Sequence, residues 1–152
     1  MKALRILAAL PLALFAEDYP KSPDQRIVIE LVAEAPEIVT PTGVGVDSKG
    51  RVLVIESHTH FRPKNYEGPE RDRVLMFTPQ AKGKAKRSIF FEGLNMGMDA
   101  TVGADDWVYL AERSRILRVK DTTGDGKADK SEDVIVMKTT GTYPHNGLSG
   151  LC

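Results

Sequence analysis

The feature that most constrains this chain is an internal repeat. Residues 45–55 read as the end of an apolar strand, a short polar turn and a second strand rich in β-branched residues. Shifted by 56 positions, the same pattern recurs over residues 102–111. The chain is therefore expected to use one structural unit twice, and each unit should begin with a β-hairpin.

A second match lies at a different distance along the chain. Val74–Phe77 falls on Leu117–Lys120 at a shift of 43. The two shifts differ by 13, which an insertion in the first unit would produce. Residues 58–70 are the predicted insertion, because they are rich in His, Pro and charge and show no periodicity.

Each unit should hold four short strands, with the fourth over residues 88–91 in the first unit and 133–136 in the second. Four strands every 43 to 56 residues is the spacing of a β-propeller blade. The chain is therefore predicted to be all-β, with about two blades and the start of a third near residues 145–148. Closed propellers have about four to eight blades, so the chain is expected to form part of a larger propeller and to be inactive by itself. Chance similarity among β-hairpins is the alternative.

The polar loop over residues 121–132 has the ligand spacing of an EF-hand-type calcium loop. Oxygen ligands stand at loop positions 1, 3, 5, 9 and 12, with glycine at 6 and a backbone carbonyl at 7. The flanking residues look like strands, so the loop is expected on a hairpin rather than between helices. A polar turn without an ion is the alternative. The predicted calcium ligands are Asp121, Thr123, Asp125, Lys127 through its carbonyl, Asp129 and Glu132.

The first residues differ in composition from the rest. Lys2 and Arg5 stand at the start of an apolar run over residues 6–16, which ends at Glu17. A helix of that length spans about 16 Å, too short to cross a bilayer. Residues 1–16 are therefore predicted to be a signal peptide, and the protein to be exported to the periplasm or cell envelope. A buried N-terminal helix is the alternative.

Charge and cysteine content exclude several classes of function. The 21 basic and 21 acidic side chains cancel, so no bulk positive field is present to hold a nucleic acid. Cys152 is the only cysteine, which excludes a disulfide framework and a Cys-rich zinc site within the chain. Nucleic acid is not an expected partner, and membrane association is expected only through parts outside this sequence.

Four stretches, taken together, resemble a known group: residues 41–47, 56–61, 121–130 and 143–151. They are similar to the N-terminal propeller of the membrane-bound dehydrogenases of planctomycete-type bacteria, relatives of the glucose/sorbosone dehydrogenase-like propellers. The resemblance implies a partial, dehydrogenase-like β-propeller over residues 25–152. It further implies a six-bladed quinoprotein-type propeller with calcium, pyrroloquinoline quinone as the cofactor of the sugar dehydrogenases, and a C-terminal haem c module in many members.

The same resemblance implies one catalytic residue. His145, in a His-Asn-Gly-Leu stretch, matches the general base of the quinone-dependent sugar dehydrogenases. An imidazole with a pKa near neutrality can take the alcohol proton while hydride leaves the same carbon for the quinone. A histidine that caps a turn is the alternative reading of His145.

Two functions follow as expectations. The first is part of an exported, calcium-containing propeller dehydrogenase that oxidises a sugar or other alcohol and passes electrons to an acceptor such as a cytochrome c. The second is a non-catalytic, calcium-stabilised propeller that binds glycans or a protein partner.

Glu56, His58 and His60 form another cluster, at the end of a predicted strand. His58 and His60 would point to the same side and could share a metal, but no third ligand is evident from spacing. A structural loop and a substrate-lining loop are the alternatives.

Overall fold

The computed structural model describes residues 20–138 and 148–151. Residues 20–31 belong to a unit of their own, in which the Asp24 carboxylate accepts hydrogen bonds from the Arg26 backbone and side chain. A second unit begins at Val32 and contains all the strands of the described residues. The predicted signal peptide, residues 1–16, lies outside the described part. Within that part, no helix has the length and apolar character needed to cross a membrane.

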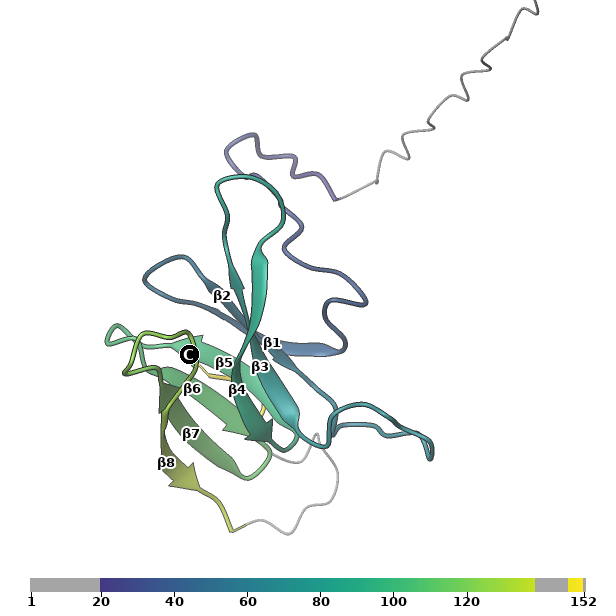
Figure 1. The fold of residues 1–152 in the computed structure, drawn as a ribbon, viewed down its shortest axis with the longest axis vertical. Coiled ribbons are helices and arrows are strands. Elements are labelled where there is room, and N and C mark those ends of the chain that lie inside the picture. Colours follow the sequence, from purple (N-terminus) through teal and green to yellow (C-terminus); the bar gives the residue numbers. More distant parts are fainter. Residues whose placement is uncertain (1–19, 139–147, 152) are drawn as a thin grey trace, which may run out of the picture. The chain divides into compact units, whose positions relative to one another are not determined.

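The described strands form two four-stranded antiparallel sheets, each in the order of the sequence (Figure 1). The first sheet consists of β1 (Pro41–Val46), β2 (Val52–Glu56), β3 (Asp72–Thr78) and β4 (Lys86–Leu94). The second sheet consists of β5 (Gly97–Val102), β6 (Val108–Glu112), β7 (Arg115–Lys120) and β8 (Lys130–Val136). The all-β class and the four strands expected in each unit are confirmed.

The opening hairpins of the two sheets share one register at a shift of 56. Val46 pairs with Val52 in the first sheet, as Val102 pairs with Val108 in the second. The pairing register shifts near the start of each first strand, after Pro41 in β1 and after Gly97 in β5. The turn residues Gly50 and Asp106 both have positive φ. The repeat therefore extends to the backbone geometry.

The third strands follow a shift of 42, one less than the sequence match indicated. Leu75 pairs with Ile89 just after a bulge, and Leu117 pairs with Asp133 just after the equivalent bulge. The sequence match had placed Val74 on Leu117 because both are buried and apolar. The two sheets bury non-equivalent faces against each other. In each strand, therefore, the residue that faces the core is one position away from the residue that would face it if the equivalent faces were buried.

The inner core lies between the sheets. The first sheet contributes Leu53, Ile55, Val74 and Met76, and the second contributes Val108, Leu110, Leu117 and Val119. At a shift of 56, Val108 corresponds to Val52, which packs on the opposite face of the first sheet. One face of the first sheet therefore packs against the opposite, non-equivalent face of the second, an arrangement we call front-to-back stacking. In a face-to-face arrangement, the equivalent faces of the two sheets would contact each other.

We call the opposite face of the first sheet its outer face; it is formed by Val54, Leu75 and Phe77. It is covered by Ala33 and Ile38, from the segment that leads into β1. The outer face of the second sheet carries the residues that correspond to the inner face of the first, among them Tyr109 and Ile116.

Glycines allow the first strands of the two sheets to approach closely. A Cβ placed on Gly43 would lie 2.5 Å from the Cα of Asp99 in β5, and one on Gly45 would lie 3.2 Å from Cγ2 of Val102. The first of these contacts involves backbone, which cannot move aside as a flexible side chain can. β1 and β5 therefore need glycine at position 43 to lie side by side.

The predicted insertion is confirmed as a difference in connections. β2 and β3 are joined by residues 57–71, whereas β6 and β7 are joined by residues 113–114 alone. The long connection extends beyond the strand ends of the first sheet (Figure 1).

Gly43→Val should destabilise the protein by about 3 kcal/mol, because the added side chain meets backbone on β5. Urea unfolding followed by circular dichroism measures the loss. Val44→Ala is the matched control, since Val44 is exposed in the same strand. A Gly43→Val protein as stable as the wild type would contradict the close approach.

Candidate functional site

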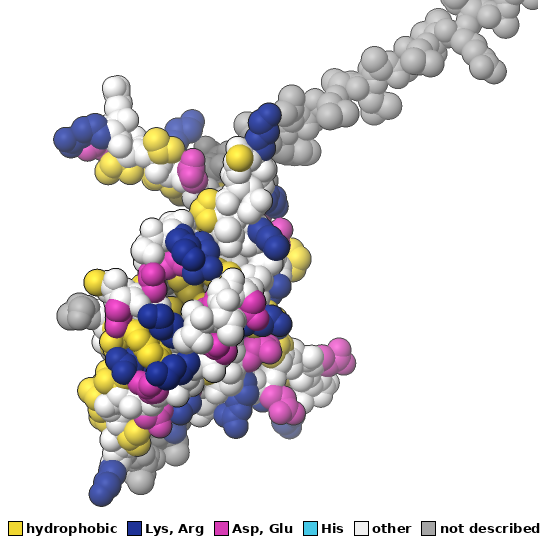
Figure 2. Space-filling model, turned by 60° about the vertical axis from the view of Figure 1, so that its left-hand side comes forward, with side chains coloured by type: hydrophobic (Ala, Val, Ile, Leu, Met, Phe, Trp, Pro, Cys, Tyr) yellow, Lys and Arg dark blue, Asp and Glu magenta, His cyan; other side chains and the backbone are white. Residues whose placement is uncertain are grey.

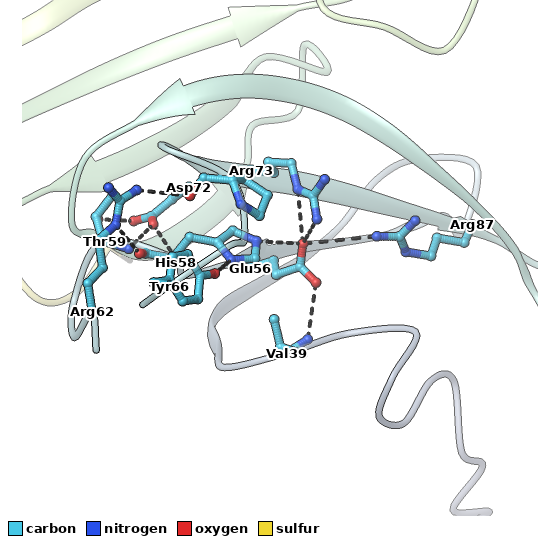
Figure 3. A network of polar contacts seen from close by, with 10 residues as sticks. Val39, Glu56, His58, Thr59, Arg62, Tyr66, Asp72, Arg73 and Arg87 are labelled. Carbon is cyan, nitrogen blue, oxygen red and sulfur yellow. Dashed lines mark hydrogen bonds and ion pairs between the residues drawn. The ribbon is translucent and has the colours of Figure 1, made fainter. Parts of the chain in front are cut away.

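Polar side chains gather at the base of the 57–71 insertion, where β2 ends and β3 begins (Figure 3). Glu56 is the last residue of β2 and Asp72 the first of β3, and both are buried, with 2% and 0% exposure. A buried carboxylate is costly unless hydrogen-bond donors surround it. The neighbours of these two carboxylates therefore determine how the insertion is held.

Asp72 accepts hydrogen bonds from the insertion and from the second sheet. The backbone N–H groups of His58 and Thr59 donate to Oδ1, and the Thr59 hydroxyl donates to Oδ2 at 2.8 Å. The N–H of Gly97, the first residue of β5, donates to Oδ2 at 2.8 Å. Asp72 thus joins the start of the insertion to the second sheet.

Glu56 holds a different set of donors. Its Oε2 accepts from Arg73 Nε at 3.0 Å and from His58 Nε2 at 3.0 Å, and its Oε1 accepts from the Val39 N–H at 3.1 Å. Burial acts to raise the pKa of Glu56, but the hydrogen bonds from His58, Arg73 and Val39 outweigh it and lower the pKa. Glu56 is therefore a carboxylate that links the end of β2 to Val39, His58 and Arg73 through hydrogen bonds.

The ring of His58 is engaged at both nitrogens. Nε2 lies against Glu56, and Nδ1 contacts the hydroxyl of Tyr66, from the middle of the insertion. Because a carboxylate only accepts, Nε2 carries the proton. His58 is 4% exposed, so its arrangement supports the structural alternative for this cluster.

An open depression of about 340 Å³ lies beside this network. Its lining is polar and comes from the insertion and from the link between the sheets: Thr59, Arg62, Glu70, Arg71 and Asn95. The guanidinium of Arg62 is fixed by the carbonyls of His58 and Pro69, at 2.8 and 2.9 Å, and lies 5.6 Å from the Tyr66 ring centroid. The depression therefore presents a donor held in place and, at Glu70, an exposed carboxylate.

Part of the network recurs in the second sheet. Glu112, which corresponds to Glu56 at a shift of 56, accepts from the Asn95 N–H at 2.7 Å and from Arg115 Nε at 2.5 Å. These donors correspond to Val39, just before β1, and to Arg73 in β3. The Glu–Arg pair is thus a feature of the repeat, whereas His58, Tyr66 and the depression belong to the insertion.

Sequence reasoning found Glu56 and His58 but missed Asp72 and Glu112. The shift of 56 that aligned the hairpins also aligns Glu56 with Glu112, and this signal was sufficient to find the repeated pair. Asp72 had no such signal, because its role depends on Gly97, which is distant in sequence.

The predicted calcium loop joins β7 to β8, so the strand flanks expected for it are confirmed. Asp121 accepts from the N–H groups of Gly124 and Gly126, and Asp129 accepts from the backbone and hydroxyl of Thr122. Glu132, at loop position 12, lies inside β8 and pairs with Arg118 at 2.6 Å.

The loop is thus ordered by its own hydrogen bonds. Asp125 accepts from the Lys127 N–H, while Thr123 turns its hydroxyl toward Asp121 at 3.4 Å. Across the described ranges, no group of three or more His, Cys, Asp or Glu side chains is arranged to hold a metal ion, and this applies to His58 and His60 as well. Calcium binding by the loop stays a prediction.

His145 lies outside the described residues, so its predicted catalytic role stays a prediction. Of the His-Asn-Gly-Leu stretch, only Leu148 is described; its N–H donates to the carbonyl of Arg113 at 3.2 Å.

Comparison with known families gives a match over nearly all of the chain. The model of a family described as "Domain of unknown function (DUF7133)" matches residues 23–151, nearly all of the chain. The chain belongs to the DUF7133 family. No curated protein and no solved structure matches it. The DUF7133 range covers both sheets and the insertion, so the candidate site lies within the family domain.

Glu56→Gln should cost about 2 kcal/mol at pH 7, because it removes the charge that the His58 and Arg73 donors surround. The folded-state pKa of Glu56 is lowered, so its contribution is complete above the ordinary carboxyl value of about 4.3 and is lost as the pH falls through the lowered value. The stability difference between wild type and variant should therefore shrink in acid.

Urea unfolding between pH 7 and pH 3 measures this difference. Glu67→Gln, an exposed carboxyl in the same insertion, is the matched control and should stay near wild type throughout. A difference that is constant across this pH range would contradict the role given to the Glu56 charge.

Proposed function

We propose that this DUF7133 domain contributes consecutive blades to a β-propeller, and that the depression beside the insertion binds a sugar or related polyol. The apolar run over residues 6–16 supports action in the periplasm or cell envelope. This is the non-catalytic alternative of the sequence interpretation, with the binding position now specified.

The front-to-back stacking of the two sheets supports the propeller. In such a ring each four-stranded sheet presents one face to the unit before it and the other to the unit after it. The inner-face residues Val108 and Leu110 correspond to Val52 and Val54, which face away from the second sheet. Two sheets that merely closed a sandwich would bury equivalent faces against each other.

The polar lining of the depression is the observation that carries the binding proposal. A sugar hydroxyl both donates and accepts, so a site for sugars needs donors and acceptors within a few ångströms. The guanidinium of Arg71 and the amide of Asn95 supply donors, and the carboxyl of Glu70 supplies acceptors. The buried network around Glu56 and Asp72 holds the base of the insertion that carries these side chains.

Arg71→Ala should weaken sugar binding at least tenfold, because it removes the donor that lines the depression at its junction with β3. Isothermal titration with a panel of neutral and acidic monosaccharides measures it. Lys64→Ala is the matched control, an exposed cation of the same insertion outside the lining. Wild-type protein that binds no member of the panel, or an Arg71→Ala protein that binds as the wild type does, would refute the site.

The resemblance over residues 143–151 favours a second function, a sugar or alcohol dehydrogenase of the quinoprotein type. Pyrroloquinoline quinone would accept hydride, and His145 would take the substrate proton. Calcium would be held by the 121–132 loop, in which the Asp121 carboxylate accepts hydrogen bonds from the N–H groups of Gly124 and Gly126. Haem c and a cytochrome c acceptor rest on the resemblance alone.

Dye reduction dependent on pyrroloquinoline quinone and a sugar tests this second function, with the protein in its full natural length. His145→Ala should lower the rate at least a hundredfold if the imidazole is the general base. His60→Ala, a histidine of the insertion, is the matched control. Equal rates for wild type and His145→Ala would remove His145 from the mechanism.

A further inference from the structure

We infer that the outer face of the second sheet, together with the edge of β8, is an interface for a further four-stranded sheet of the same repeat. The inference rests on the propeller part of the proposed function and is independent of sugar binding. The contact already present between the two sheets supplies its geometry.

The connection between β7 and β8 reaches back onto the first sheet. The N–H of Ala128 in this loop donates to the carbonyl of Phe90 in β4 at 2.8 Å, and the Ala128 side chain packs against the inner core. Gly126 of the same loop lies against the methyl group of Met76. The second sheet thus covers the edge strand of the first with its own loop.

The acceptor in this contact has an equivalent in the second sheet. Phe90 lies between Ile89 and Phe91, which pair with successive residues of β3, so it occupies a bulge. Val134 occupies the same bulge in β8, between Asp133 and Ile135. The carbonyl of Val134 is therefore the acceptor that a following loop would use.

The side chains around this second bulge are apolar and exposed. Phe90 is 4% exposed under the Ala128 loop, whereas Val134, Ile135 and Val136 are 47%, 49% and 66% exposed in the described structure. Figure 2, in which the side carrying β7 and β8 comes forward, shows hydrophobic side chains among Lys and Arg there. An apolar edge strand of this kind is a template for a partner.

The first unit has an alanine that corresponds to Ala128. Ala85, in the connection between β3 and β4, packs on the outer face of the first sheet with Ala33 and Ile38. In both units, therefore, the alanine of the third connection lies on the equivalent face of its own sheet, the face turned away from the unit that follows. In a unit that follows the second sheet, the alanine that corresponds to Ala128 would lie against Val134, as Ala128 lies against Phe90.

Residues 148–151 show the chain returning to the position from which such a unit would begin. The N–H of Leu151 donates to Oδ2 of Asp99 in β5 at 2.8 Å. Asp99 is also the residue against which Gly43 of β1 packs. Leu151 is thus bonded to the side chain of a residue in the first strand of the second sheet, and this favours a sheet of the same repeat as the occupant.

The test extends the full chain at its C-terminal end by a second copy of residues 97–138. Hydrogen–deuterium exchange of the amides at 133–137 should slow at least tenfold relative to the unextended chain. The matched control is the same extension with Ala128→Asp in the appended copy only, which should remove most of the protection.

Three results would overturn the inference. One is unchanged exchange at 133–137 although the appended copy is folded, as shown by the near-ultraviolet signal of its tryptophan. Another is an appended copy that stays unfolded, since the proposed interface should stabilise it. The third is self-association of the unextended chain that Val136→Lys abolishes, which would make a second copy the occupant. Sugar titration of the same proteins reports on the depression separately.

Discussion

The burial of one face of the first sheet against the opposite face of the second is the interaction on which the rest of this structure depends. A four-stranded sheet with two apolar faces cannot be stable alone, because one layer leaves both faces in water. Stacking covers the inner faces, and Gly43 lets the backbones of β1 and β5 come close enough to complete the contact. The outer face of the first sheet is covered by Ala33 and Ile38, whereas the apolar side chains of Val134, Ile135 and Val136 in β8 are exposed.

A polar framework is built into this apolar stack at the strand ends. Glu56 with Arg73, and Glu112 with Arg115, close the same corner of each sheet, while Asp72 adds a connection from the insertion to β5. Charged hydrogen bonds in buried surroundings are directional, so they fix the geometry of a loop that has few apolar contacts of its own. The insertion can therefore present polar side chains to solvent while its base stays rigid.

The strands and the insertion could be predicted because period, turn chemistry and repetition are local properties of a sequence. The third-strand shift was wrong by one residue for a physical reason: Val74 and Leu117 are both buried, but on faces that point in opposite directions along the stack. The loop over 121–132 shows a similar limit. Its acidic spacing was visible, but the use of Asp121 and Asp129 as acceptors for neighbouring N–H groups was not.

The order of residue types along the chain is enough to predict an all-β chain with a repeated four-stranded unit, one inserted segment and an apolar run over residues 6–16. Only the tertiary structure decided which faces meet, that Asp72 bonds to Gly97, and that the Ala128 loop covers Phe90. These contacts join residues 25 or more positions apart. Such pairs leave no trace in local periodicity, because only packing selects one partner among the many that charge and hydrophobicity would allow.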